Sequence, residues 1–345
     1  MFTRRGVIKI FGISSLLAVF GKDIAMAQFF FRPGEKRLPR HRVNAFTAKD
    51  GAALIGVSGG KPPSEMIEEA VSLIGGFERL ELKGKSVLVK PNVVSGEKNP
   101  ATTNPEVVAA VVKLLYGRGA KKVYVGDMSA LLTLSTVRNM KRNGIFQAAK
   151  EAGAEVIVFE DYGWVEVPLE GAKYIKNAYV TEWLYNVDVV VNLPVIKTHR
   201  SASYSICLKN FIGCTHLKQR PYLVDESHWE ELVSEFNLAC APDLNIVDGT
   251  VSMIEGGPWK GLTAPTDLIM ASGDRVGADV AGLGVIKSFG KWAPVTGKDV
   301  WDQSQIKRAV ELGVGRGREG MSLAVGTGGA GFAGLMEKVR AYARL

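Results

Sequence analysis

The feature that most constrains the fold is a series of short apolar runs rich in β-branched residues. The clearest is VDVVVNL at residues 187–193. Runs that are apolar at consecutive positions are typical of strands buried on both faces of a sheet. Comparable runs occupy residues 85–90, 122–126, 155–159, 244–247, 267–271 and 322–325.

Helical patterns lie between the first of these runs. Residues 107–118 follow Asn104, a suitable N-cap, and Pro105, which suits the first helical position. A second helix is expected near residues 144–151. Buried strands that alternate with helices predict an α/β fold, with a doubly wound, mainly parallel sheet and helices on both faces.

Ligands in such sheets bind beyond the carboxyl ends of the strands. The residues that follow the expected strands are therefore the first candidates for a binding site. They are Lys90, Asn92, Asp127, Lys197, His199, Asp248 and the glycines after Val325.

The densest group of reactive residues begins at the end of the 187–193 run. It includes NLPVIKTH at residues 192–199, CLKNFIGC at residues 207–214, and three of the four histidines. Imidazole and carboxylate groups serve as metal ligands or as general acids and bases. Lysines can hold an anionic substrate or, with a lowered pKa, act as base or nucleophile.

We therefore predict one cleft shared by these groups. The alternative is that the histidines cap loops and the lysines are solvated. The expected catalytic residues are Lys197, His199, Lys209 and His228. The expected cofactor-binding residues are Lys90, Asn92, Asp127 and Asn210. A divalent metal would be held by His199, His228, Asp248 and Glu255.

The order of short motifs resembles the family catalogued as domain of unknown function 362, over roughly residues 50–320. That family is defined by sequence and not by activity. Many of its members carry a ferredoxin-like cluster module, which this chain lacks. The motifs are KPN at 90–92, TTNP at 102–105, NLPxxKTH at 192–199, LKNxxG at 208–213, His228, PDLxxVDG at 242–249, EGGP at 255–258 and Asp279.

A more distant resemblance is to the nickel-pincer lactate racemases, in which a His follows an apolar strand and a Lys lies some ten residues on. His199 and Lys209 have this order and spacing. The Gly-Gly-x-Lys run of the racemases is replaced here by RSASYSI at residues 200–206. This departure argues against a pincer cofactor.

Two other cofactor classes are not expected. The three cysteines, Cys207, Cys214 and Cys240, cannot supply the four thiolates of an ordinary iron–sulfur cluster. We interpret them as small buried residues, with a disulfide as the alternative. GTGGAG at residues 326–331 resembles a dinucleotide fingerprint, but no second strand can follow in the fourteen residues that remain. A tight turn is the simpler interpretation.

Residues 1–27 have the pattern of a twin-arginine export signal. Arg4 and Arg5 precede a short apolar run at residues 10–21, and Ala25-Met26-Ala27 forms a cleavage site. The run is too short to span ~30 Å of hydrocarbon at ~1.5 Å per residue. We predict export by the twin-arginine machinery, a periplasmic protein beginning near Gln28, and no stable membrane span after cleavage. Retention of an uncleaved anchor is the alternative.

The charge distribution limits the partners. The formal net charge is +8, but much of it lies in the signal and in the basic segment 28–50, which we interpret as a solvated linker. From Gly51 onward acidic and basic residues nearly balance, which argues against nucleic acid as a partner. We expect a single α/β body over residues 51–345; a sub-division near residue 185 is the alternative.

The function expected from these features is that of an exported enzyme that depends on a metal or another cofactor and acts on a small anionic substrate. Two alternatives remain open at this point. One is a non-catalytic periplasmic protein that binds a ligand or handles a cofactor, and the other is an accessory subunit of a redox complex.

Overall fold

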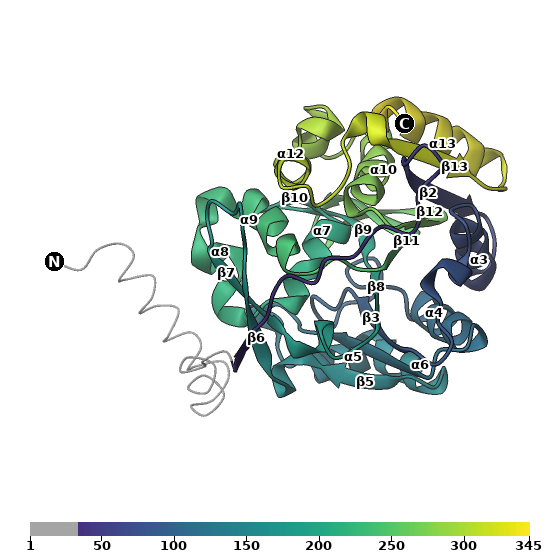
Figure 1. Cartoon of the computed structure of the whole chain (residues 1–345). Coiled ribbons are helices and arrows are strands. Elements are labelled where there is room, and N and C mark those ends of the chain that lie inside the picture. Colours follow the sequence, from purple (N-terminus) through teal and green to yellow (C-terminus); the bar gives the residue numbers. More distant parts are fainter. Residues whose placement is uncertain (1–33) are drawn as a thin grey trace.

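The structure is a computed structural model that describes residues 34–345, so the predicted signal peptide lies outside the described residues. Its centre is a ten-stranded sheet (Figure 1). Strand β12 is antiparallel to both of its neighbours, and the other neighbours along the main path are parallel. The order along that path is β13 (Met321–Val325), β2 (Ala53–Gly59), β12 (Gly261–Ser272), β11 (Leu244–Gly256), β8 (Val189–Leu193), β3 (Ser86–Pro91), β4 (Lys122–Asp127) and β5 (Glu155–Val158).

Helices cover both faces of this sheet. Successive residues of a strand point to opposite faces, so strands that are apolar at consecutive positions need a helical layer on each side. In β3, Val87 and Val89 join one core and Leu88 joins the other. The first core is closed by α3 (Pro63–Ser72), α4 (Pro105–Gly117) and α6 (Ile145–Glu151). The second is closed by α7 (Cys207–Asn210), α9 (Trp229–Phe236), α10 (Arg275–Ser288), α12 (Ser304–Glu311) and α13 (Ala330–Ala343). The predicted doubly wound α/β fold is confirmed.

The predicted strands at residues 85–90, 122–126, 155–159 and 187–193 correspond to β3, β4, β5 and β8. Asn104 caps α4 as predicted, because its Oδ1 accepts a hydrogen bond from the amide of Glu106 at 3.0 Å.

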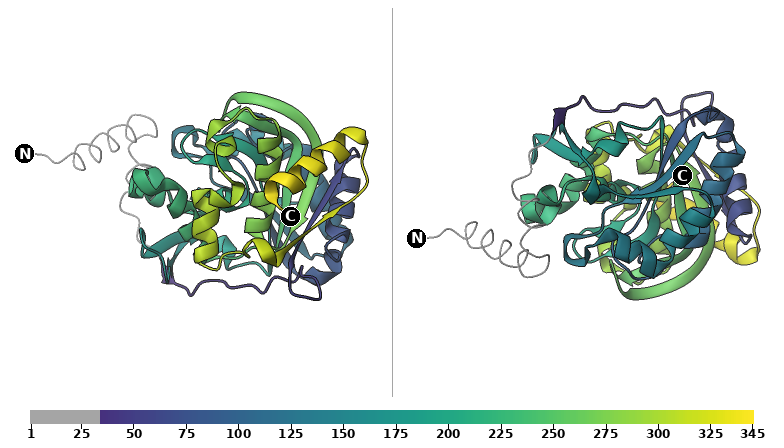
Figure 2. Two further views of the ribbon diagram at one scale, coloured as in Figure 1. Left: turned by 90° about the horizontal axis from the view of Figure 1, so that it is seen from above. Right: turned by 90° about the horizontal axis from the view of Figure 1, so that it is seen from below.

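Several strands differ from the expectation. Strands β11 and β12 are longer than predicted and form an extended antiparallel hairpin, the curved green band in Figure 2. Strand β9 (Val195–His199), which pairs with β10 (Ser203–Ser205), was not among the expected strands. Pro194 separates β8 from β9, which begins at the next residue and pairs in parallel with β11.

The segment before residue 51 also differs. Over its described part it is not a free linker, but crosses the molecule from the small sheet of β1 (Glu35–Lys36), β6 (Trp164–Pro168) and β7 (Asn177–Thr181) toward β2 (Figure 1). Arg40 donates to the carbonyls of Leu184 and Asp188, and Phe46 is fully buried. The hydrogen bonds of Arg40 therefore anchor this segment to the α/β body.

In the part of the chain that the structure describes, no helix combines the length and apolar character needed to cross a membrane.

Candidate functional site

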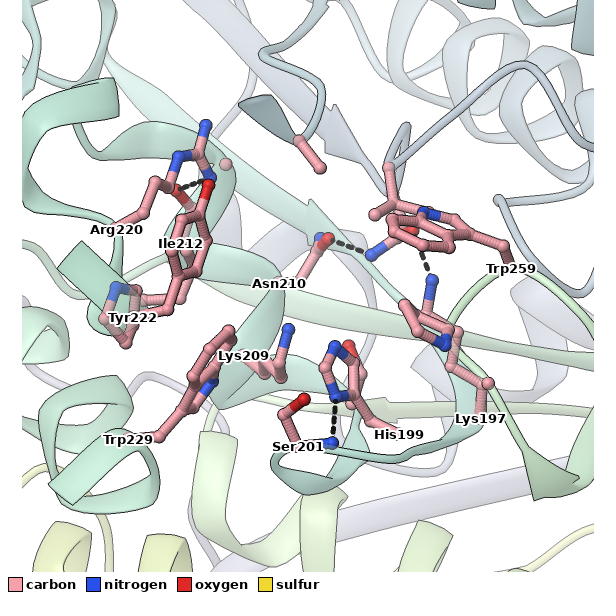
Figure 3. Close-up of a pocket in the computed structure, with 18 of the residues that line it drawn as sticks. Lys197, His199, Ser201, Lys209, Asn210, Ile212, Arg220, Tyr222, Trp229 and Trp259 are labelled. Carbon is pink, nitrogen blue, oxygen red and sulfur yellow. Dashed lines mark hydrogen bonds between the residues drawn. The ribbon is translucent and has the colours of Figure 1, made fainter. Parts of the chain in front are cut away.

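A cavity of about 480 Å³ opens at the carboxyl ends of the central strands. It receives side chains from the ends of β3 and β4, from β9 and from α7 (Figure 3). Seven predicted site residues line it: Lys90, Asn92, Asp127, Lys197, His199, Lys209 and Asn210.

Strand β9 explains how two of these residues reach the cavity. Side chains two positions apart on a strand point to the same face, so Lys197 and His199 face the cavity together. Both are almost completely buried, with 1% and 6% of their surface exposed.

An ion pair forms part of the cavity floor. The Nζ atom of Lys90 lies 2.7 Å from Oδ1 of Asp127, and both side chains are buried. Asp127 also accepts hydrogen bonds from the amides of Met128 at 2.8 Å and Val93 at 2.7 Å. These partners offset the cost of burying both charges. The backbone of Gly213 covers the pair closely, since a Cβ there would lie 2.1 Å from Oδ1 of Asp127.

A chain of asparagine amides, hereafter the amide chain, connects the strands beneath the cavity. Asn92 donates to Oδ1 of Asn210 at 3.0 Å, and Asn210 donates to Oδ1 of Asn192 at 2.8 Å. Asn192 in turn donates to Oδ1 of Asn245 at 2.9 Å. Asn210 also accepts from Nζ of Lys90 at 3.1 Å. The amide chain therefore ties β3, α7, β8 and β11 to one another.

Lys197 is bound on two sides. Its Nζ donates to Oδ1 of Asn92 at 2.8 Å and to the carbonyl of Ala101. Burial lowers the pKa of Lys197 well below its ordinary value, and the charges of Lys209 and Lys90 lower it further. Lys197 has no ion pair with a carboxylate within residues 34–345.

His199 is held in one orientation. Its Nδ1 accepts a hydrogen bond from the amide of Ser201 at 3.2 Å, which leaves the proton of the neutral ring on Nε2. Burial lowers the pKa of His199 well below its ordinary value, and the charges of Lys209 and Lys197 add to this. The ring is therefore neutral near pH 7.

Lys209 differs from the other two lysines. Among the residues described, its amine has neither a hydrogen-bond partner nor an ion pair. Burial, together with the charges of Arg220 and Lys90, lowers the pKa of Lys209 to about 7. Helix α7, which carries it, is anchored by Asp279 of α10, which accepts from the amides of Cys207 at 2.6 Å and Leu208 at 3.3 Å.

Four further residues of the cavity were not predicted from the sequence. Arg220 is buried and donates to the carbonyls of Ile212, Met128 and Ser129, without a carboxylate partner in an ion pair among the described residues. Tyr222 and Trp229 stack with ring centroids 5.2 Å apart on one side, and Trp259 lies on the other (Figure 3). Trp259 directly follows the EGGP motif, which could have drawn attention to it; no sequence signal marks the other three.

Three predicted residues do not join the cavity, so the expected convergence is wrong for them. His228 lies outside the cavity. Its Nδ1 is 2.8 Å from Oδ2 of Asp225, and its ring stacks on that of Tyr174. Asp248 is buried but accepts from Asn99 at 2.9 Å and from the amide of Asn104 at 2.8 Å. It therefore holds the loop that leads into α4. Glu255 is exposed on β11.

The predicted metal site is consequently not assembled. His199 lies in the cavity without His228, Asp248 or Glu255. Across residues 34–345 no group of three or more His, Cys, Asp or Glu side chains is arranged to hold a metal ion. Cys207, Cys214 and Cys240 are all buried and free.

Comparisons with a family model, with curated proteins and with solved structures each show a similarity. The family described as "Domain of unknown function (DUF362)" matches residues 87–284. A thylakoid-associated protein of Synechocystis sp. is 28% identical over 213 residues, which are 60% of this chain and 64% of that protein. The aligned region thus spans less than two thirds of that relative. The lactate racemase apoprotein from Thermoanaerobacterium thermosaccharolyticum aligns with a TM-score of 0.32 and 14% identity, over 62% of this chain and 52% of that one.

The family match covers more than half of the sequence and includes every predicted cavity residue from Lys90 to Asn210. The chain therefore belongs to the DUF362 family, whose domain has no assigned function.

Proposed function

We propose that the cavity is the active site of an enzyme that binds a small organic anion, with Lys209 as the group that transfers protons and neutral His199 as a hydrogen-bond donor. The observation that carries this proposal is an excess of cationic groups without counter-ions. Lys197, Lys209 and Arg220 line one cavity, and none of them forms an ion pair within the described chain.

The energetics favour an anionic ligand. Burying an unpaired charge costs several kcal/mol, and an ion of opposite sign offsets that cost. Two carboxylates of the described chain line the cavity. Asp127 is already paired with Lys90, and Glu226 is exposed and forms no ion pair with the three cations. Burial lowers the pKa of Arg220, but the ordinary value is so high that a guanidinium keeps its positive charge at neutral pH.

The remaining walls suit the body of an organic molecule. Tyr222, Trp229 and Trp259 offer apolar ring surfaces, whereas the polar groups gather around Lys209 and Asn210 (Figure 3). Pockets for small molecules usually combine an apolar lining with a few convergent polar groups.

Acid–base chemistry is supported by the two groups beside this space. A general acid or base works best when its pKa lies near the working pH, and that of Lys209 is about 7. Neutral His199 presents a donor at Nε2, which no hydrogen bond within residues 34–345 occupies. Lys209 can therefore exchange protons with a bound ligand, and the Nε2–H of His199 can stabilise negative charge on that ligand.

A ligand screen tests the proposal. We expect at least one member of a panel of small carboxylates and phosphates to raise the melting temperature of the protein, because a ligand that binds the native state stabilises it. Calorimetry should then show affinity reduced roughly ten- to a hundredfold in Lys209→Met, the loss expected for one charged hydrogen bond. Lys113→Met, on the exposed face of α4, is the matched control. Equal affinity in both variants, or no ligand in the panel, would contradict the proposal.

We also propose that the protein reaches the periplasm through the twin-arginine machinery. The support is the Arg4-Arg5 motif with the Ala25-Met26-Ala27 cleavage site. Replacing both arginines with lysine is expected to leave the full-length chain in the cytoplasm, whereas the wild type is recovered from the periplasm starting near Gln28. Fractionation with N-terminal mass analysis checks this. Undiminished export of the lysine variant would refute it.

A further inference from the structure

We propose that Lys209 is a nucleophile that forms an imine with the carbonyl carbon of a small oxo acid. This inference rests on the proposed anion site and names its substrate class. It assigns Lys209 covalent chemistry in addition to charge recognition and proton transfer.

The first support is the free amine. A lysine acts as a nucleophile only through its unprotonated lone pair, and a carboxylate partner would keep the proton in place. Lys90 is paired with Asp127, and Lys197 donates to two oxygen atoms. In the described part of the chain, Lys209 alone of these three has no partner.

The second support is the surroundings of this amine. It lies in a cavity large enough for a small acid, beside other cationic groups and largely shielded from solvent. Desolvation and neighbouring cations are the two devices by which proteins activate lysine nucleophiles. With its pKa at about 7, a large fraction of Lys209 is unprotonated at neutral pH, roughly a thousandfold more than for an exposed lysine.

The neighbouring groups fit the carbonyl and the carboxylate of an oxo acid. Arg220 retains its positive charge and can attract the carboxylate. The ring of His199 lies beside Lys209 in Figure 3, with Nδ1 already occupied by the amide of Ser201. Its Nε2–H is left to donate a hydrogen bond to the carbonyl oxygen as that oxygen gains charge.

The reaction balances without an added oxidant or reductant. The lone pair of Nζ attacks the carbonyl carbon, the C=O π electrons move to oxygen, and one proton passes from nitrogen to that oxygen to give a carbinolamine. The C–O bond then breaks as the C=N bond forms. The second nitrogen proton leaves with the hydroxyl group, so the products are one neutral imine and one water.

Reductive trapping tests this step. Purified protein is incubated with pyruvate and sodium cyanoborohydride, which reduces an imine to a stable secondary amine, and is then analysed by intact mass and peptide mapping. We expect a single adduct on Lys209, with a labelling rate that rises between about pH 6 and 8. Acetone, which has the carbonyl but no carboxylate, should label far more slowly.

Three variants make the outcome decisive. Lys209→Met and Lys209→Arg should give no adduct while retaining cooperative thermal unfolding, and Lys113→Met should be labelled like the wild type. Labelling spread over exposed lysines, or undiminished in Lys209→Arg, would overturn the proposal. If small anions bind but Lys209 is not labelled by pyruvate, the imine is refuted and the anion site stands; if nothing binds, both fail.

Discussion

Replacing Gly213 with alanine is expected to destabilise the protein by about 3–5 kcal/mol, the cost typical of disrupting a buried ion pair. A Cβ at this position would lie 2.1 Å from Oδ1 of Asp127 and 2.6 Å from Nζ of Lys90. Neither group can move into solvent, because each side chain is only 3% exposed. The ion pair must therefore separate, or the loop that carries Gly213 must move off the cavity floor.

Urea denaturation of Gly213→Ala against the wild type measures this loss. Gly117→Ala is the matched control, since Gly117 is the last residue of α4 and a Cβ there would meet no atom within 4 Å. The control should change the free energy of unfolding by no more than about 1 kcal/mol. A Gly213→Ala variant as stable as this control would show that the Lys90–Asp127 pair does not need the close backbone.

Replacing Lys209 with methionine is expected to stabilise the protein below pH 7 by up to about 5 kcal/mol, the free energy linked to a pKa lowered from 10.5 to about 7. Because burial lowers the pKa of Lys209 to about 7, the unfolded chain binds more protons than the native state between that pH and about 10.5. The wild type consequently gains stability as the pH rises through this window. The advantage of the methionine variant is full below pH 7, shrinks above it and disappears near pH 10.5.

Denaturation curves of the wild type and Lys209→Met at several values between pH 6 and 10 give the measurement. Lys113→Met, at an exposed position, should show no such trend. If the difference between Lys209→Met and the wild type is constant with pH, the native pKa of Lys209 is not lowered, and its proposed reactivity loses its basis.

The sequence predicted the strands whose pattern does not depend on distant neighbours. β3 and β8 are apolar at consecutive positions because helices cover both faces of the sheet, and that requirement is visible locally. β2 was missed because two glycines in ALIGVSG weaken its pattern. β9 was missed because it follows Pro194 directly and because its pairing with β11 depends on residues some fifty positions away.

The candidate site was predictable where it lies directly after strands. Lys90, Asn92 and Asp127 share the cavity because the carboxyl ends of neighbouring parallel strands lie together. His228 and Asp248 also occur in motifs, but partners outside the cavity bind them. The imidazole of His228 pairs with Asp225. The carboxylate of Asp248 accepts hydrogen bonds from Asn99 and from the amide of Asn104. A motif does not reveal whether its polar residue faces a ligand or stabilises a loop. Arg220 and Trp229 reach the cavity only through the packing of α8 (Pro221–Val224) and α9.

The amide chain has a consequence for how the molecule tolerates changes of charge. Asn92, Asn210, Asn192 and Asn245 do not ionise, so the bonds that set the spacing of β3, β8, β11 and α7 stay the same at every physiological pH. Lys209 stands next to Asn210 in the same short helix. Its amine can lose or regain a proton while the scaffold below it keeps one shape. The group that changes its protonation state is thus separate from the hydrogen bonds that hold the strands and α7 at fixed distances.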